Sequence, residues 1–187
     1  MLGILNMAMI FLIGGIIMLS EKLLKELNKQ INYELYSANY YLAMAGYCLS
    51  EDLPGFANFF IAQAEEEKFH AMKFFNFVDE MDGKIKISGL EEPEEDYKSA
   101  LEVFKAALEH EKFVTKRIYH LMDIAMEEKE HATISFLKWF VDEQIEEENS
   151  MKDIIVQLEK ISGDSHAMYM LDKELGQRVF TPPADSN

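Results

Sequence analysis

The chain has 187 residues, 49% of them hydrophobic, which is long and apolar enough for one domain with a sizeable core. Its 34 acidic residues outnumber its 18 basic residues, and the net charge of −16 argues against a nucleic-acid partner and favours the concentration of cations. Only nine Gly and four Pro are present, so few residues interrupt the periodic apolar pattern and the composition favours long helices.

Residues 1–17 form an uncharged, apolar segment of borderline length for a membrane span, with no Lys or Arg before it. No Ala-x-Ala cleavage pattern follows, so the segment is also a weak secretory signal. Met18 stands shortly before Ser20, which suits the N-cap of a helix. We expect translation to begin at Met18 and residues 1–17 to be a misassigned extension; a membrane anchor and a secretory signal are the alternatives.

Two long helices should follow, over about residues 21–49 and 56–81, separated by a turn at residues 50–55. The next segment, residues 85–96, contains a Gly and a Pro and is too long for a tight turn. It suits a crossover along the length of a bundle, after which the third helix would run parallel to the second.

After the crossover, the pattern predicts two more long helices and a short one, over about residues 97–126, 132–161 and 167–177. The last residues, 180–187, contain two prolines and should be a disordered tail. We therefore predict an all-α fold for residues 18–179, a four-helix bundle with a long crossover between its second and third helices and a short fifth helix at the end.

Each of the four long helices carries one glutamate in the apolar row that should face the core: Glu34, Glu67, Glu111 and Glu147. Glu67, for example, shares a helical face with Phe60 and Phe74. Burying an unpaired carboxylate costs on the order of several kcal/mol, so such positions exclude acids unless a cation compensates them. His70 adds an imidazole one turn after Glu67. One inward acid per helix with an inward histidine is the arrangement that holds a pair of metal ions in a di-iron carboxylate bundle.

These residues lie in a chain that, over residues 18–178, resembles the bacterial and archaeal non-haem ferritins. The strongest similarity is in residues 32–37, 66–70, 136–144 and 146–148. The resemblance implies a ferritin-like bundle whose copies assemble as a homo-oligomeric hollow shell of 24 subunits. It also implies a ferroxidase activity that oxidises ferrous iron with dioxygen or peroxide, and storage of the product as a ferric mineral.

The resemblance further implies two iron positions that share Glu67 as a bridging ligand. The first would be held by Glu34, Glu67 and His70, and the second by Glu67, Glu111 and Glu147, with Gln144 beside it. A third position, typical of the prokaryotic members, would use Glu66, Glu143, Glu146 and Glu147. These residue types suit the chemistry, because iron accepts carboxylate oxygens and imidazole nitrogens, and one bridging carboxylate can span two ions roughly 3.5 to 4 Å apart.

Tyr41 resembles the tyrosine beside the iron centre in this family, and an aromatic side chain that only fills the core is the alternative. Trp139, also matched in the family, is assigned mainly to core packing. Glu130 and His131 are candidates for the lining of an iron entry channel. The histidines other than His70 fall outside the ligand row and are predicted at the surface: His110, His120, His131 and His166.

Several motifs of related families are missing from this sequence, and their absence argues against the corresponding functions. Haem-binding bacterioferritins repeat Glu-x-x-His on the fourth helix, whereas this chain has Gln144-Ile145-Glu146-Glu147, so no haem is expected. The single cysteine, Cys48, excludes the four-cysteine iron site of rubrerythrins and indicates a reducing, cytoplasmic setting. No phosphate-binding Gly-rich loop or Gly-x-Ser-x-Gly motif occurs, so nucleotide binding and serine hydrolysis have no support.

Two alternative functions stay open. The chain could form a storage shell with weak ferroxidase activity, or a structural or membrane-tethered bundle whose inward acids bind no metal. The second alternative leaves acids in four apolar rows uncompensated, which would destabilise the fold, and a membrane partner is therefore not expected. Ferrous iron added in air, followed by ferric absorbance at several iron-to-subunit ratios, separates these functions.

Overall fold

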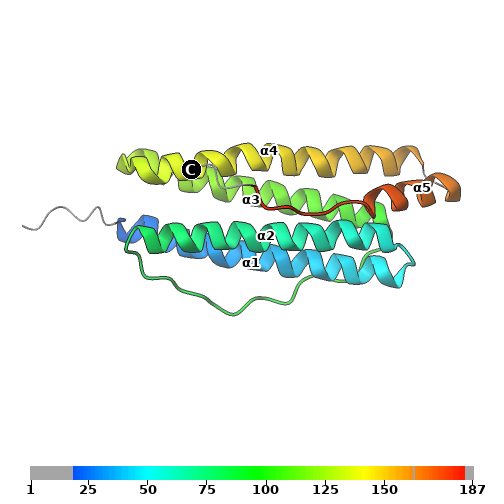
Figure 1. Cartoon of the computed structure of the whole chain (residues 1–187), viewed down its shortest axis with the longest axis horizontal. Helices are drawn as coiled ribbons and strands as arrows, with labels where there is room; N and C mark the ends of the chain where they lie inside the picture. The colour runs from blue at the N-terminus through cyan, green and yellow to red at the C-terminus, as the bar shows by residue number, and fades with distance from the viewer. Residues whose placement is uncertain (1–18, 162, 184–187) are drawn as a thin grey trace, which may run out of the picture.

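A computed structural model describes residues 19–161 and 163–183 of the chain (Figure 1). These residues form five helices and no strand: α1 (Glu21–Ser50), α2 (Pro54–Glu80), α3 (Ala100–Glu128), α4 (His131–Lys160) and α5 (Ser165–Leu175). The first four lie alongside one another and α5 is a short addition at one end, which confirms the predicted all-α fold (Figure 1). The predicted extension at 1–17, the expected start at Met18 and residues 184–187 of the predicted tail lie outside the described residues.

The helix starts differ slightly from the predicted ones because caps decide them. α2 begins at Pro54 and not at 56, since the fixed φ of proline suits the first turn of a helix. α3 begins after Ser99, whose hydroxyl accepts a hydrogen bond from the Glu102 N–H at 3.2 Å, and not at 97. Asp164 likewise caps α5, which begins earlier than the predicted 167.

The crossover between α2 and α3 runs the length of the bundle beside α1, and α2 and α3 therefore point the same way, as predicted (Figure 1). Two asparagines of α1 hold it in place. Asn28 accepts a hydrogen bond from the Lys86 N–H at 2.5 Å and donates to the Lys84 carbonyl at 3.0 Å. Asn32 accepts from the Ser88 N–H at 2.7 Å. These side chains satisfy backbone groups of a segment that has no secondary structure of its own.

The apolar core is divided into two clusters, one toward each end of the bundle. One contains Met44 and Phe104, and the other contains Leu27 and Phe74. Burial of each such side chain contributes roughly 1.5–3 kcal/mol, so both clusters hold the four helices together. Every long helix passes from one cluster to the other, and buried polar residues of all four helices form a layer between the clusters. This polar layer contains the inward acids.

α5 is attached to the start of α2 through a buried carboxylate. Asp172 accepts hydrogen bonds from the N–H groups of Gly55 at 2.7 Å and Phe56 at 3.1 Å, which are free because Leu53 provides no side-chain cap. Gly55 is needed here, since a Cβ on it would lie 1.6 Å from the Asp172 carbonyl oxygen. The chain after α5 therefore starts from a fixed point at the N-terminal end of α2.

No helix within 19–161 or 163–183 is both long and apolar enough to span a membrane.

Candidate metal centre

Each of the four long helices contributes one buried glutamate to the polar layer between the two apolar clusters. The exposed fractions are 1% for Glu34, 2% for Glu67, 0% for Glu111 and 4% for Glu147, and His70 is 2% exposed. All five side chains point inward, as the helical spacing predicts. Helical periodicity sufficed here because the apolar rows of all four helices are interrupted at the same level of the bundle.

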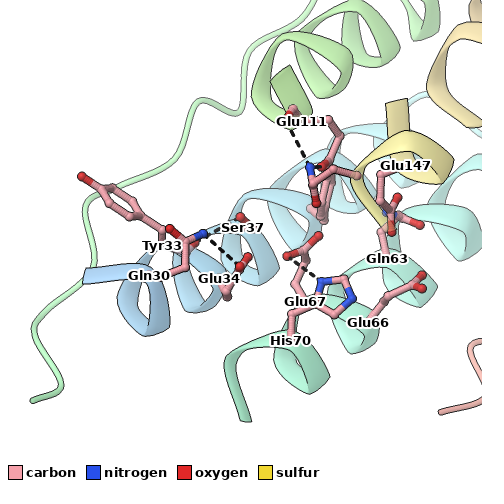
Figure 2. A network of polar contacts seen from close by, with 12 residues as sticks. Gln30, Tyr33, Glu34, Ser37, Gln63, Glu66, Glu67, His70, Glu111 and Glu147 are labelled. Atoms are coloured by element: carbon pink, nitrogen blue, oxygen red, sulfur yellow. Dashed lines mark hydrogen bonds and ion pairs between the residues drawn. The ribbon is translucent and has the colours of Figure 1, made fainter. Parts of the chain in front are cut away.

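Glu34, Glu67 and His70 form a group of possible metal ligands that is buried throughout (Figure 2). One ligand atom of each lies within 4.8 Å of the others, and the His70 Nδ1 is 3.6 Å from the Glu67 Oε2. Within the described part of the chain, three buried atoms of this group have no hydrogen-bond partner: Glu34 Oε2, Glu67 Oε2 and His70 Nε2. An unsatisfied buried polar group costs about 1–3 kcal/mol, and more when it is charged. A cation held by the ligand atoms of this group would compensate the two buried carboxylates.

Two glutamines lie one helical turn before the inward acids, and sequence reasoning missed them. The Gln30 amide donates to the Glu34 Oε1 at 3.0 Å, and the Gln63 amide donates to the Glu147 Oε2 at 2.8 Å (Figure 2). Each amide holds one carboxylate oxygen and leaves the other oxygen free to bind. The signal was present, since both glutamines share the inward row with an acid four residues later.

Glu111 lies on the opposite side of the polar layer, where Tyr41 and Gln144 meet it. The Tyr41 hydroxyl donates to the Glu111 Oε1, and the Gln144 amide donates to the Glu111 Oε2 at 3.1 Å and to the Thr115 hydroxyl at 3.3 Å. The structure thus brings both predicted neighbours to this carboxylate. Glu111 and Glu147 are not part of the group of Glu34, Glu67 and His70.

Burial and mutual repulsion shift the pKa values of these acids upward. Burial raises the pKa of Glu34 well above 4.5, and the charge of Glu67 adds to the shift. Burial and the charges of Glu111 and Glu147 do the same to the pKa of Glu67. The pKa of Glu147 rises to about 8, through burial first and the charges of Glu111 and Glu66 second. A cation held between the carboxylates would reverse these shifts.

Hydrogen bonds partly offset this effect on the Glu111 side. Burial raises the pKa of Glu111, whereas the hydrogen bonds from Tyr41 and Gln144 lower it. Burial and the nearby Glu111 charge raise the pKa of the Tyr41 hydroxyl well above 10. Tyr41 therefore keeps its proton and donates it in a hydrogen bond to the carboxylate.

A second group of possible ligands shares His70 with the first. Ligand atoms of Glu66, His70 and Glu143 lie within 4.8 Å of one another. Of the residues predicted for a third iron position, the structure brings Glu66 and Glu143 together, while Glu146 is exposed and stands outside this group. The Glu66 Oε2 also accepts a hydrogen bond from the Arg178 guanidinium at 2.9 Å. Nothing in local spacing pointed to Arg178, because it lies 112 residues further along the chain.

Trp139 is half-buried and packs edge-on to His70, with ring centroids 5.5 Å apart. The Lys73 ammonium lies 4.3 Å from the centroid of the same ring. Trp139 therefore packs against a residue of the polar layer as well as against the apolar core.

The surface prediction was right for His120, His131 and His166, which are exposed, and wrong for His110. The His110 ring is half-buried between Tyr36 and Tyr40, and its Nε2 is 2.8 Å from the Ser37 hydroxyl. Burial lowers the pKa of His110 to about 4. Glu130, predicted near an entry channel, caps α4 by accepting from the Thr133 N–H at 2.6 Å.

Comparison with known proteins agrees with this arrangement. Residues 24–161 match the ferritin-like domain family. The bacterial non-heme ferritin of Staphylococcus aureus is 47% identical over 163 residues, which cover 87% of this chain and 98% of that protein. A closed form of the Archaeoglobus fulgidus ferritin, engineered by site-directed mutagenesis, has a TM-score of 0.86 and 49% identity over 87% of this chain and 99% of its own.

A humanized archaeal ferritin has a TM-score of 0.87 and 48% identity, covering 88% of this chain and 99% of that chain. The structural match is therefore accompanied by nearly the same level of sequence identity as the match to the bacterial protein. Because the family match extends from the first turn of α1 to the end of α4, the whole bundle is included, and the chain belongs to the ferritin family.

Proposed function

We propose that the protein is an iron storage ferritin that oxidises Fe(II) inside the bundle of each subunit. The observation that carries the proposal is the convergence of Glu34, Glu67 and His70, whose ligand atoms lie within 4.8 Å of one another at the gap between two apolar clusters. All three residues are buried, and each has a polar atom without a hydrogen-bond partner in the described part of the chain. Carboxylate oxygens with one imidazole nitrogen suit Fe(II). Membership of the ferritin family supports the same assignment.

Iron is the substrate in this proposal, and two ions react together. We assign one iron position to Glu34, Glu67 and His70, and the other to Glu67, Glu111 and Glu147. Each Fe(II) loses one electron, and the two electrons with two protons reduce dioxygen to hydrogen peroxide, or hydrogen peroxide to two waters. Glu67 is the shared ligand, because one carboxylate spans ions roughly 3.5 to 4 Å apart.

The surrounding residues orient the ligands. Gln30 and Gln63 each hold one oxygen of Glu34 and Glu147, and Tyr41 and Gln144 together hold both oxygens of Glu111. Fixed outer hydrogen bonds of this kind decide which oxygen faces the metal and commonly change metal affinity by roughly 10–100-fold when removed.

We further propose that the ferric product is stored inside a closed shell of 24 copies. The high coverage of bacterial and archaeal ferritins over their own lengths supports this assembly. A shell of 24 chains of 21.6 kDa has a mass of roughly half a megadalton. Light scattering or native mass spectrometry, with metal content measured on the same sample, tests the proposed assembly.

The test of the ferroxidase proposal is the double variant Glu67→Ala with His70→Ala. It removes the shared ligand and the one imidazole of the site, so the fast rise in ferric absorbance after addition of Fe(II) in air should disappear. Ala favours the helix and adds no buried charge, so the bundle should still assemble. His166→Ala, at an exposed position, is the control and should keep the parental rate. A parental initial rate in the assembled double variant would contradict the di-iron assignment.

A further inference from the structure

The chain after α5 turns back along α2 (Figure 1). We call residues 176–183 the C-terminal strap. Two contacts attach it to α2: the Asn58 amide donates to the Arg178 carbonyl at 2.8 Å, and the Phe180 ring lies 5.7 Å from the Phe69 ring. The strap thus covers the face of α2 that also carries Glu66.

Arg178 carries a positive charge into one of the two ligand groups. Its guanidinium donates to the Glu66 Oε2 at 2.9 Å and lies 4.4 Å from the centroid of the Phe59 ring. The two side chains are 26% and 17% exposed, so the pair is only partly screened by solvent. Among the described residues, Arg178 is the one Lys or Arg whose ion pair involves an acid of either ligand group.

Glu66 has a second possible partner at the same place. Its carboxylate belongs to the group in which ligand atoms of Glu66, His70 and Glu143 lie within 4.8 Å of one another. His70 is 2% exposed and its Nε2 has no hydrogen-bond partner in the described part of the chain, so this group holds an unsatisfied nitrogen as well as acids. A metal ion that uses Glu66 must compete with the Arg178 guanidinium for the same carboxylate.

We propose that Arg178 is an internal competitor for metal at the group of Glu66, His70 and Glu143, and that metal binding there releases the C-terminal strap from α2. The proposal rests on the proposed function, because it concerns entry of the same ions to a group that shares His70 with the buried site. A divalent ion has twice the charge of a guanidinium and can bind the Glu66 and Glu143 carboxylates together, even when the imidazole of His70 is a ligand in the buried site. It therefore displaces Arg178 once its concentration is high enough.

Release of the strap should be visible at a single tryptophan. Trp139 is the one Trp in the chain, and its ring centroid is 6.2 Å from that of Phe69, on which Phe180 packs. Departure of Phe180 exposes Phe69 and changes the surroundings of the indole. Trp139 fluorescence therefore reports on the strap without requiring oxidation of iron.

The experiment uses the assembled, metal-free protein and Zn²⁺, which has no redox chemistry, as the probe. Calorimetric titration should resolve a tight class of sites at the buried group and a weaker class at Glu66. In Arg178→Gln the weaker class should bind about tenfold more tightly, while the tight class is unchanged. Arg178→Lys keeps the charge and should stay close to the parental protein.

Fluorescence provides the second readout. In the parental protein, the Trp139 signal should change in step with filling of the weaker class. Arg178→Gln should begin with the changed signal and respond little to that class. Glu66→Gln should also begin with the changed signal and lose the weaker class altogether, while the tight class persists.

Two results would overturn the proposal: unaltered affinity of the weaker class in Arg178→Gln, or saturation of that class without a change in Trp139 fluorescence. Absence of the tight class from both proteins is a different result, since it contradicts the proposed function. Tight binding with an unaltered weaker class contradicts only the role of Arg178.

Discussion

On α1, two glutamates about two helical turns apart have opposite electrostatic surroundings. The side chain of Glu26 is 13% exposed and pairs with Lys29 at 2.7 Å and Arg117 at 2.8 Å. Glu34 is 1% exposed and has a glutamine and another acid as its neighbours. Burial raises the pKa of Glu26, but the hydrogen bonds from Lys29 and Arg117 outweigh it and bring the pKa to about 2.

The two glutamates differ in whether a basic side chain pairs with the carboxylate. Where a carboxylate is structural, as at Glu26, a basic side chain lies within 3 Å of it. Where the carboxylate faces the polar layer, as at Glu34 and Glu67, the described chain supplies no Lys or Arg in an ion pair. The missing positive charge is the strongest reason to expect a metal there, because several buried acids without cations destabilise a fold.

The largest expected effect is stabilisation by metal. Saturating Zn²⁺ should raise the unfolding temperature of the metal-free protein by several degrees, since a ligand at 100 times its dissociation constant adds about 2.7 kcal/mol per site. Differential scanning fluorimetry measures the shift. The double variant Glu67→Ala with His70→Ala is the matched control and should show most of the shift lost. An equal shift in both proteins would mean that Zn²⁺ binds elsewhere.

The same substitution should have opposite effects at the two kinds of acid. Glu147→Gln removes a poorly compensated buried charge, so it should raise the free energy of unfolding of the metal-free protein at pH 8 by about 1–3 kcal/mol. The unfolding temperature should rise accordingly. Its amide oxygen can still accept from Gln63. Glu26→Gln removes a paired charge and should lower the unfolding temperature by a comparable amount. Shifts of the same sign in the two variants would contradict the opposite electrostatic roles assigned to Glu147 and Glu26.

The pH dependence of stability should follow the buried acids. The pKa of Glu147 is about 8 in the folded protein and ordinarily 4.5, so its contribution to stability is fully present below pH 4.5 and is lost as the pH rises through about 8. The pKa values of Glu34 and Glu67 are also raised, so these two acids should likewise make the folded protein less stable as the pH rises. The metal-free protein should therefore melt at a lower temperature at pH 8 than at pH 5.

Glu26 provides a control for this pH dependence, because folding lowers its pKa and raises the pKa of Glu147. Its pKa is lowered to about 2, so its contribution is present above pH 4.5 and is lost only as the pH falls through about 2. It contributes no slope between pH 5 and 8. Glu147→Gln should flatten the slope in that window and Glu26→Gln should leave it intact. A slope that Glu147→Gln does not reduce would contradict the origin assigned to it.

The smallest effect is expected at the surface. Lys22 pairs with Glu127 at 2.9 Å, but the side chains are 55% and 72% exposed. Solvent and salt screen such a pair, so Lys22→Ala should leave the unfolding temperature within error of the parental value. A clear decrease would mean that pairing alone stabilises this protein, even where burial is absent.

Local periodicity was enough to predict the helices and the inward acids. Glu34, Glu67, Glu111 and Glu147 stand in apolar rows with a spacing that any helix turns toward its core, and the structure buries all four. The roles of these residues as iron ligands stay a prediction. Helix starts were less accurate, because the side chains of Ser99 and Asp164 cap the following turn and override the apolar pattern.

Other features depend on neighbours that are distant in sequence. His110 is half-buried because α1 places Ser37 and two tyrosines against it. Glu66 receives a positive charge because Asp172 attaches α5 to α2 and directs Arg178 back along that helix. Neither contact can be predicted from the spacing of residues that are close together in the sequence.

The amino-acid sequence by itself therefore determined the helical fold, the crossover and the inward direction of four acids, since these depend on turns of a few residues. Only the tertiary structure decided which acids receive a basic partner and which do not. The reason is physical: burial and charge pairing depend on distances between helices, and Arg178 comes within 2.9 Å of Glu66 only after α5 has docked on α2.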